Sequence, residues 1–368
     1  MSYQPSDSAV DYQRQLDAKV ASFQHLMAQA GIQLPALKVH PSEPLGFRMR
    51  AEFRVWHEQG KAHYAMNKPG EKRPYIIEDF PIGSALINQL MPPMMEAVNN
   101  SEALSRKLFS MEFLTTTSGQ ALVTLIYHRP LGEVWQAQAT ELQNQLNIKI
   151  IGRSRKQKLV LSEDYVTETL EVNGRDYQYQ QVESGFTQPN AQVNQKMLTW
   201  ASDCLSDKKH QSSGDLIELY CGNGNFTAVL AQHFDKLLAT EISKVSVNSA
   251  LTNFAANQID NVTVARLSSE EFTQALNKVR AFRRLADIDL DSFNFSTIFV
   301  DPPRAGLDSG TEKLVTELDN ILYISCNPKT LVANLVEITK THKIVSAALF
   351  DQFPWTEHIE SGVYLSRL

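Results

Sequence analysis

The chain has 368 residues, of which 43% are hydrophobic and 21% charged, and its formal net charge at pH 7 is -6. This composition is typical of a folded globular protein and excludes a disordered or fibrous chain, while the length predicts two domains. No apolar stretch approaches the about 18 residues of a membrane span. The N-terminal sequence MSYQPSDSAV is polar. We therefore expect no membrane segment, no signal peptide and a cytoplasmic protein.

Charge is distributed unevenly along the chain. Residues 46–160 hold 15 Lys and Arg against 10 Asp and Glu, a balance of +5, whereas the remainder holds 20 and 31, a balance of -11. A basic module is typical of proteins that bind a polyanion, although ordinary scatter of surface charge fits the same numbers. Cys204, Cys221 and Cys326 have spacings that match neither a zinc ribbon nor an iron–sulfur cluster, which predicts free thiols and no metal site.

The first half of the chain has an α+β pattern. Apolar positions in residues 11–30 recur every three or four residues, which predicts an amphipathic helix ending at Gly31. We interpret the Pro-containing segment LPALKVHPSEPLG as a linker. Helical patterns follow at 85–98 and 134–146, among β-like runs that read FRMRAEFRVW, AHYAM, RPYIIEDF, FLTTT, ALVTLIYHR, IIGRSRKQKLVL and YQYQQ.

The second half predicts an α/β domain. From Gly214 on, helical patterns alternate with five strand-like runs, DLIELYC, KLLATEI, VTVARL, TIFVDPP and ILYISC, which is typical of a parallel sheet with crossover helices. Two further runs, IVSAALF and SGVYLSRL, are close enough to pair as an antiparallel hairpin, unlike an all-parallel dinucleotide-binding fold. We place the domains at 1–45 (helix and linker), 46–176 (α+β) and 177–368 (α/β).

Ligands of an open α/β sheet bind beyond the carboxyl ends of its strands. The run ELYCGNGNF places Gly222 and Gly224 in such a turn, where a ligand can approach the backbone, and Glu241 can accept hydrogen bonds from both hydroxyls of an adenosine ribose. Thr227 replaces the third glycine of a dinucleotide fingerprint. A plain two-glycine turn and a solvated carboxylate are the alternatives to a nucleotide site.

Two further clusters follow predicted strands. Two prolines after an apolar strand hold an extended backbone, so Asp301 is expected to project into the cleft, although a simple strand terminator has the same sequence. Arg304 follows these prolines where amino-group methyltransferases usually have a stacking aromatic, which argues against that chemistry. Cys326 precedes a helix whose first turn contains Pro328, and helix N-terminal amides lower the pKa of a thiol. We therefore expect a nucleophilic thiolate, with an inert core thiol as the alternative.

The run HIESGVYL offers His358 and Glu360 just before the last predicted strand. If the closing hairpin folds back over the sheet edge, the carboxylate of Glu360 can reach a substrate held by Cys326. A surface glutamate is the alternative.

The motifs CGNGNF, FVDPPRAGLD, YISCNP and FDQFPWTEHIE together resemble the RNA uridine-5-methyltransferase family and look closest to its tRNA branch. The runs RMRAEFRVWH and FTQPNAQVN extend the resemblance along the chain. Ribosomal-RNA branches usually carry a TRAM barrel or an iron–sulfur cysteine cluster, which we do not find here. A methyltransferase acting on rRNA, an NAD-dependent oxidoreductase and a non-catalytic RNA chaperone are the alternatives.

The resemblance implies a class I (Rossmann-like) S-adenosylmethionine-dependent methyltransferase domain with a mixed seven-stranded sheet, plus a smaller α+β RNA-binding domain. It implies formation of 5-methyluridine at position 54 of the tRNA T loop, through a covalent bond between Cys326 and C6 of the base. Glu360 then removes the C5 proton. The implied S-adenosylmethionine contacts are Gln188, Tyr220, Asn225, Glu241 and Asp301, of which Asp301 could instead bind the base.

The resemblance also indicates how RNA is held. Phe186 resembles the aromatic that stacks on the flipped nucleotide. Arg48, Arg50 and Arg54 are expected to hold phosphates, with Phe47, Phe53 and Trp56 interleaved between them; solvation of a surface strand is the alternative. The expected partners are the tRNA T arm and other T-loop-like RNA, with no membrane, and we expect a monomer. Ser361 stands where close relatives are expected to have Cys, a change that should not alter proton abstraction.

Overall fold

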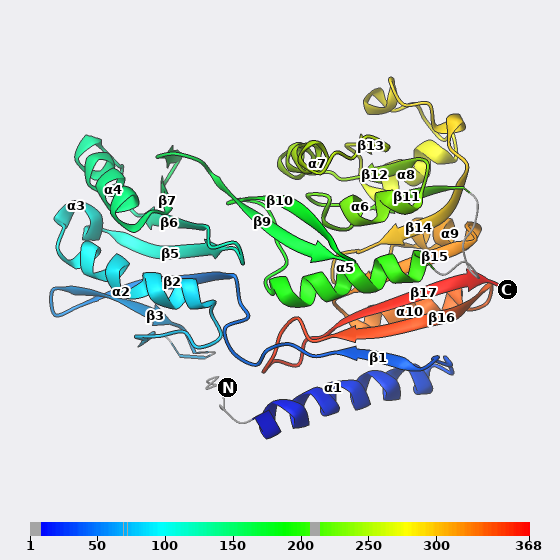
Figure 1. The fold of residues 1–368 in the computed structure, drawn as a ribbon, viewed down its shortest axis with the longest axis horizontal. Helices are drawn as coiled ribbons and strands as arrows, with labels where there is room; N and C mark the ends of the chain where they lie inside the picture. Colours follow the sequence, from blue (N-terminus) through cyan, green and yellow to red (C-terminus); the bar gives the residue numbers. More distant parts are fainter. Residues whose placement is uncertain (1–8, 69, 72, 207–213) are drawn as a thin grey trace. The chain divides into compact units, whose positions relative to one another are not determined.

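The computed structural model describes residues 9–68, 70–71, 73–206 and 214–368 (Figure 1). Contacts divide the chain into two compact units. Of the described residues, those within 43–169 and 180–191 form the first unit, and those within 9–42, 170–179 and 192–368 form the second. Within the described ranges, no helix has the length and apolar character needed to cross a bilayer.

The first unit is built on a seven-stranded sheet with the order β4-β3-β2-β5-β6-β7-β8, in which β6 and β7 are parallel and the other pairs antiparallel. Its core joins apolar side chains of the sheet to those of α2 and α4. The strands are β2 (Arg50–Glu58), β3 (Lys61–Met66), β4 (Tyr75–Ile76), β5 (Leu108–Thr115), β6 (Ala121–Tyr127), β7 (Lys149–Ser154) and β8 (Gln157–Val160). The helices are α2 (Ala85–Asn99), α3 (Glu102–Ser105) and α4 (Glu133–Leu146), of which α3 was not predicted.

The second unit is built on an eight-stranded sheet with the order β1-β16-β17-β15-β14-β11-β12-β13 (Figure 1). The seven strands predicted after Gly214 are confirmed, including the closing antiparallel hairpin. They are β11 (Asp215–Leu219), β12 (Leu237–Thr240), β13 (Val262–Ala265), β14 (Phe295–Val300), β15 (Asn320–Ser325), β16 (His342–Phe350) and β17 (Glu360–Arg367). The eighth strand, β1 (Leu37–His40), pairs in parallel with β16, so interpreting this segment as a linker was wrong.

Helices complete the second unit. Phe23 and Met27 of α1 lie in the core together with Leu331 and Leu335 of α10, and the predicted end of α1 is confirmed by the left-handed conformation of Gly31 (φ +71°). The helices are α1 (Ala9–Gln29), α5 (Ala191–Ser206), α6 (Asn225–Leu230), α7 (Lys244–Ala256), α8 (Ser269–Leu276), α9 (Ser309–Glu317) and α10 (Pro328–Ile338). A hairpin of β9 (Tyr165–Val172) and β10 (Arg175–Val182) is divided between the two units.

Strand β17 lies between β15 and β16 and is antiparallel to both. The neighbouring β15, β14, β11 and β12 are parallel, so their carboxyl ends meet at one edge of the sheet. Because β17 runs the other way, it begins at that same edge. Its first residue is Glu360, and Ser361 pairs with Ser325, the last residue of β15.

Trp200 of α5 packs directly on β17 at Gly362. A Cβ atom added to Gly362 would lie 2.6 Å from Cζ3 and 2.8 Å from Cη2 of Trp200, and 3.1 Å from Cδ1 of Ile324. Since Trp200 is 2% exposed, it has little room to move away.

We predict that Gly362→Ala lowers the free energy of unfolding by about 1–3 kcal/mol, because the added methyl overpacks the core. Urea unfolding monitored by circular dichroism measures the change. Gly132→Ala is the control, since an added Cβ there meets no atom within 4 Å, and it should destabilise the protein less. Equal stability of Gly362→Ala and the native protein would contradict this packing.

Candidate active site

The polar residues predicted at the strand ends gather at the carboxyl edge of the second unit's sheet. Leu219 of β11 pairs with Val300 of β14 and with Thr240 of β12. The residues that follow these three, Tyr220, Asp301 and Glu241, therefore stand at the same level. Cys326 follows β15, and Glu360 begins β17. The structure thus brings together five of the residues singled out from the sequence.

The turn after β11 has an open backbone and an oriented carboxylate. Glu241 accepts hydrogen bonds from the backbone N–H of Gly222 (3.1 Å) and of Ser243 (2.7 Å). Gly222 has φ +56°, and a Cβ added there would meet no atom within 4 Å. Gly224 has φ +78°, and its Cβ would lie 2.6 Å from Cε1 of Phe254. Close packing therefore explains Gly224, while the space at Gly222 is open to a ligand.

Two more of the predicted cofactor residues flank this turn. Tyr220 is half-buried with φ +63°, a left-handed conformation that is uncommon for an aromatic residue, and its hydroxyl donates to Oγ of Ser269 (2.7 Å). Asn225 begins α6, and its side-chain amide exchanges two hydrogen bonds, 2.8 and 2.9 Å long, with that of Asn194. Each amide keeps a second N–H and a second lone pair. Asn194 was not predicted, although it lies in the quoted run FTQPNAQVN.

Cys326, Glu360, Asp301 and Arg304 form a cluster of ionisable groups that interact. Glu360 is 5% exposed, and burial raises its pKa to about 8, with Asp301 acting in the same direction and Arg304 against it. Burial likewise raises the pKa of Asp301 to about 7. Both acids are therefore largely or partly protonated near neutral pH. The surface-glutamate alternative for Glu360 is excluded by its burial.

The expected lowering of the Cys326 pKa was wrong. The thiol is half-buried, and burial raises its pKa to about 11, together with the neighbouring Glu360 and Asp301; Arg304 opposes this rise. Burial and the two neighbouring acids outweigh any effect of the N-terminus of α10, where the side chain of Asn327 already accepts a hydrogen bond from the Lys329 N–H (3.2 Å). Cys326 is therefore a neutral thiol at neutral pH, and the residue is half-buried at the sheet edge.

Arg304 is the exposed cation of this cluster and was not predicted as a site residue. One of its guanidinium nitrogens lies 3.3 Å from Nδ1 of His358. Its backbone carbonyl accepts hydrogen bonds from the side chains of Asn327 (2.9 Å) and Thr330 (3.3 Å). The DPPR segment is therefore tied to the first turn of α10, next to the thiol.

The remaining predicted site residues belong to the first unit. Arg50 donates to the carbonyls of Glu183 (2.7 Å) and Gly185 (2.8 Å), and Arg48 donates to the carbonyl of Arg50 (2.8 Å). These contacts hold the backbone next to Phe186, whose side chain is 74% exposed. Arg50 is thus engaged within its own unit, and a phosphate would compete with these carbonyls. Gln188, two residues further on, is half-buried.

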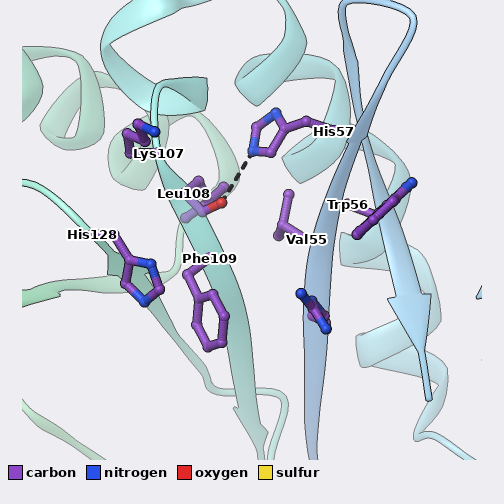
Figure 2. A pocket seen from close by; sticks show the side chains of 8 residues that line it. Val55, Trp56, His57, Lys107, Leu108, Phe109 and His128 are labelled. Carbon is purple, nitrogen blue, oxygen red and sulfur yellow. Dashed lines mark hydrogen bonds between the residues drawn. The ribbon is translucent and has the colours of Figure 1, made fainter. Parts of the chain in front are cut away.

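Figure 2 shows a pocket on the first unit's sheet, with Trp56, Phe109 and His128 among the side chains that line it. The third predicted arginine, Arg54, also lines this pocket. Its guanidinium lies 5.6 Å from the centre of the Trp56 ring and 5.8 Å from that of Phe109, which stacks on His128 at 4.4 Å. Lys107 and His57 also line the pocket. The pocket offers cations and aromatic faces together, which suits RNA bases and phosphates.

The predicted interleaving of aromatics is confirmed in part. Trp56 lies beside Arg54, but Phe47 and Phe53 are 3% and 1% exposed and belong to the interior, so placing them between the arginines was wrong. The aromatic neighbour missed from the sequence is Phe109, which is 38% exposed. In the sequence, Phe109 is marked only as an apolar residue on the polar face of its strand, β5. Its stacking partner His128 follows the end of the next strand, β6.

A buried carboxyl group lies in β11, just before the glycine turn. Glu218 is 1% exposed, and its Oε2 has no hydrogen-bond partner among the described residues. Burial raises its pKa to about 8, and nearby Asp301 raises it further while Thr227 opposes this. Glu218 is therefore protonated in the folded protein at neutral pH.

An open, mostly parallel sheet in which an antiparallel last strand is inserted beside β15, with ligand-binding features at its carboxyl edge, defines a class I methyltransferase fold. A sequence profile described as tRNA (uracil-5-)-methyltransferase matches residues 11–368. The chain belongs to this family. The predicted resemblance is confirmed, which removes the oxidoreductase alternative.

Individual relatives agree with the family assignment. A tRNA/tmRNA (uracil-C(5))-methyltransferase of Cellvibrio japonicus is 56% identical over 98% of this chain and 97% of its own length. A tRNA/tmRNA (uracil-C(5))-methyltransferase of Teredinibacter turnerae is 62% identical over 87% of this chain and 88% of its own length. The crystal structure of Pyrococcus abyssi tRNA (uracil-54, C5)-methyltransferase, with S-adenosyl-L-homocysteine, superposes with a TM-score of 0.69 at 19% identity, covering 96% of this chain and 83% of that one. It supports the fold.

We predict that Glu218→Gln makes stability less dependent on pH. Because the folded pKa is raised above the unfolded value near 4.5, the unfolded chain loses its proton first, and stability falls as pH rises towards 8. One such group contributes about 1.4 kcal/mol per pH unit in this window. Thermal unfolding midpoints at pH 5.5 and 8 should differ less in the variant than in the native protein. An unchanged difference would show that Glu218 is already ionised.

Proposed function

We propose that this protein methylates C5 of uridine 54 in the T loop of tRNA, with S-adenosylmethionine as the methyl donor. Family membership and the names of the close relatives support tRNA as substrate. Those names include tmRNA, which supports T-loop-like RNA as a second substrate. The observation that carries the chemistry is the placement of a half-buried thiol and a buried carboxyl group at one edge of the sheet.

The chemistry of uracil requires a nucleophile and a base. C5 attacks a methyl group poorly until sulfur adds to C6, because the new C6–S bond moves electrons into the ring and makes C5 nucleophilic. Cys326 supplies that sulfur as its thiolate, after the thiol has released its proton to solvent. After methyl transfer C5 carries both a methyl group and a hydrogen, so a base must take this proton before the C6–S bond can break. Glu360 supplies the base.

The residues at the sheet edge fit S-adenosylmethionine, which supplies an electrophilic methyl group when bound. The open backbone at Gly222 gives it access, and Glu241, fixed by two backbone N–H groups, offers its remaining lone pairs to ribose hydroxyls. Tyr220, Asn225 and Asp301 complete this set in the second unit. Gln188 of the first unit remains a predicted contact.

RNA recognition is assigned to the first unit. Phe186 is exposed and its backbone neighbours are held by Arg50, which suits a side chain that stacks on a flipped nucleotide. Arg54 and the aromatic pocket around it suit a phosphate and its adjacent base. We assign Arg48 and Arg50 mainly to holding this segment and Arg54 to the phosphate. The protein is expected to act as a cytoplasmic monomer.

We predict that Glu360→Gln traps the covalent RNA adduct. Sulfur still adds to C6, but C5 keeps its proton, so the C6–S bond breaks slowly. Labelled S-adenosylmethionine and unmodified tRNA should give a band on denaturing gels that carries both protein and RNA, with loss of about 100-fold or more in turnover.

Cys326→Ala is the matched control. It should give neither an adduct nor 5-methyluridine at position 54, which nuclease mapping of the labelled tRNA measures. Methyl transfer by Cys326→Ala would refute the proposed function. Full turnover by Glu360→Gln without an adduct would refute only the role of Glu360.

We predict that Arg54→Ala raises the KM for tRNA by about fivefold, with little change in kcat, and reduces the slope of log KM against log salt by about one, as expected for one lost phosphate contact. Steady-state kinetics at several salt concentrations measure both. Arg73→Ala is the control, because Arg73 is an exposed arginine of the same unit that pairs with Glu58. Equal effects of the two variants would contradict a specific role for Arg54.

A further inference from the structure

The connection between β16 and β17, residues 351–359, determines how the chain arrives at Glu360. Phe350 and Glu360 are paired across the two strands, so the loop leaves the sheet after one member of this residue pair and re-enters it at the other. The loop therefore sets the position of the carboxylate relative to Cys326. Asp351 and Gln352, at its start, are both fully buried.

Helix α1, at the other end of the chain, binds this loop through a buried charge pair. Nζ of Lys19 lies 2.6 Å from Oδ1 of Asp351 and donates to the carbonyl of Phe353 (3.0 Å). The side chains of Lys19 and Asp351 are 5% and 0% exposed. Burying two charges removes them from water, and such a pair adds little net stability compared with apolar side chains of similar size. Its energetic cost indicates a role in fixing geometry.

Two further residues on the same face of α1 contact the loop. Oε1 of Gln15 accepts the backbone N–H of Trp355 (2.6 Å), and the ring of Tyr12 meets the Trp355 ring edge-on at 5.9 Å. Tyr12, Gln15 and Lys19 are spaced by three and four residues, which puts them on one face of the helix. Trp355 has φ +66°, and a left-handed conformation costs a non-glycine residue about 1–2 kcal/mol. Contacts with α1 offset that strain.

The segment after α1 supports the loop from the side of the sheet. The backbone N–H of Asp351 donates to the carbonyl of His40 in β1 (3.0 Å), and the His40 ring stacks on Phe350 at 4.7 Å. The Tyr12 hydroxyl accepts the N–H of Ser42 (2.8 Å), which ties β1 back to the helix. Residues 12–42 thus hold the start of the loop from two directions.

We propose that α1 is a positioning element for the catalytic base, and that Lys19 is its central residue. Through Asp351 and Phe353 it holds the 351–359 loop in the conformation that keeps Glu360 beside Cys326. Lys19 touches neither substrate nor reacting atoms and acts through the loop. This inference rests on the proposed function, since it assumes that Glu360 removes the C5 proton.

A purely structural role of α1 predicts a different pattern. The helix is anchored to the core by Phe23 and Met27, each 1% exposed, which lie one and two turns beyond Lys19. Loss of Lys19 leaves these anchors in place. The contact with the loop can therefore be weakened while the helix stays docked.

The test compares Lys19→Met with Phe23→Leu, a variant that weakens the anchor of the same helix and leaves the polar contacts of Gln15 and Lys19 with the loop in place. Lys19→Met should lower kcat by about tenfold, because small misplacements of a reacting group are costly. The KM for tRNA should stay within about twofold, since the RNA contacts are unchanged. The covalent RNA adduct should also accumulate, because proton removal slows more than sulfur addition. Phe23→Leu should lower the unfolding temperature and accumulate no adduct.

Two more variants keep the test decisive. If Lys19→Met does not fold, Lys19→Met with Asp351→Asn removes the uncompensated buried charge, and Gln15→Ala removes one loop contact while leaving the charge pair intact. Each should accumulate adduct in proportion to its loss of kcat. Unchanged kcat, a change in KM alone, or equal adduct in Phe23→Leu would overturn the inference. Adduct formation by Glu360→Gln and loss of methyl transfer by Cys326→Ala are measured alongside, so failure of the role of Glu360 or of the proposed function is seen separately.

Discussion

The register of β17 is the constraint on which the rest of the site depends. Ser361 of β17 pairs with Ser325 of β15. Because the two strands are antiparallel, Glu360, which precedes Ser361, meets Cys326, which follows Ser325, at the carboxyl edge of the sheet. Side chains alternate between the two faces of a strand, so a slip of one residue would turn Glu360 to the other face. Gly362 supports this register, since Trp200 packs where a side chain would stand. An all-parallel sheet would begin its last strand at the opposite edge and could not present this carboxylate.

Burial gives the site its acid–base character. Asp301 interacts with both Glu218 and Glu360, and each of the three acids has its pKa raised to about 7 or 8, mainly by desolvation. Keeping these acids protonated avoids placing several negative charges together in a poorly solvated region. The same arrangement lowers stability as pH rises, because the unfolded chain ionises its carboxyl groups several pH units earlier. Arg304 is the cation that opposes this tendency at the thiol and at Glu360.

Sequence patterns predicted the strands and helices of the second unit and the residues at its strand ends, because periodicity and strand-end motifs are local. They missed β1, whose four residues LKVH lie between prolines and form a strand only by pairing with β16, about 300 residues away. The Cys326 pKa was wrong for a similar reason. The helix start is visible in the sequence, but the burial and the facing acids come from distant segments. Lys19 belongs to no recognisable motif, and although Asp351 lies in the quoted run FDQFPWTEHIE, nothing in that run indicates a partner 332 residues away.

The pKa values of Cys326 and Glu360 suit the two steps in which these groups act, addition of sulfur to C6 and removal of the C5 proton. At pH 8, forming the thiolate of Cys326 against a pKa of about 11 costs three units at 1.36 kcal/mol each, or about 4 kcal/mol. A turnover near 1–10 per second corresponds to a total barrier of about 16–17 kcal/mol, so this cost leaves most of the barrier for bond formation. Glu360, with a pKa of about 8, is half ionised at that pH and needs almost no free energy to act as a base. A thiol that is neutral at rest is protected from oxidation, since the thiolate is the reactive form. A base with a pKa near the working pH is suited both to taking the proton from C5 and to releasing it before the next cycle.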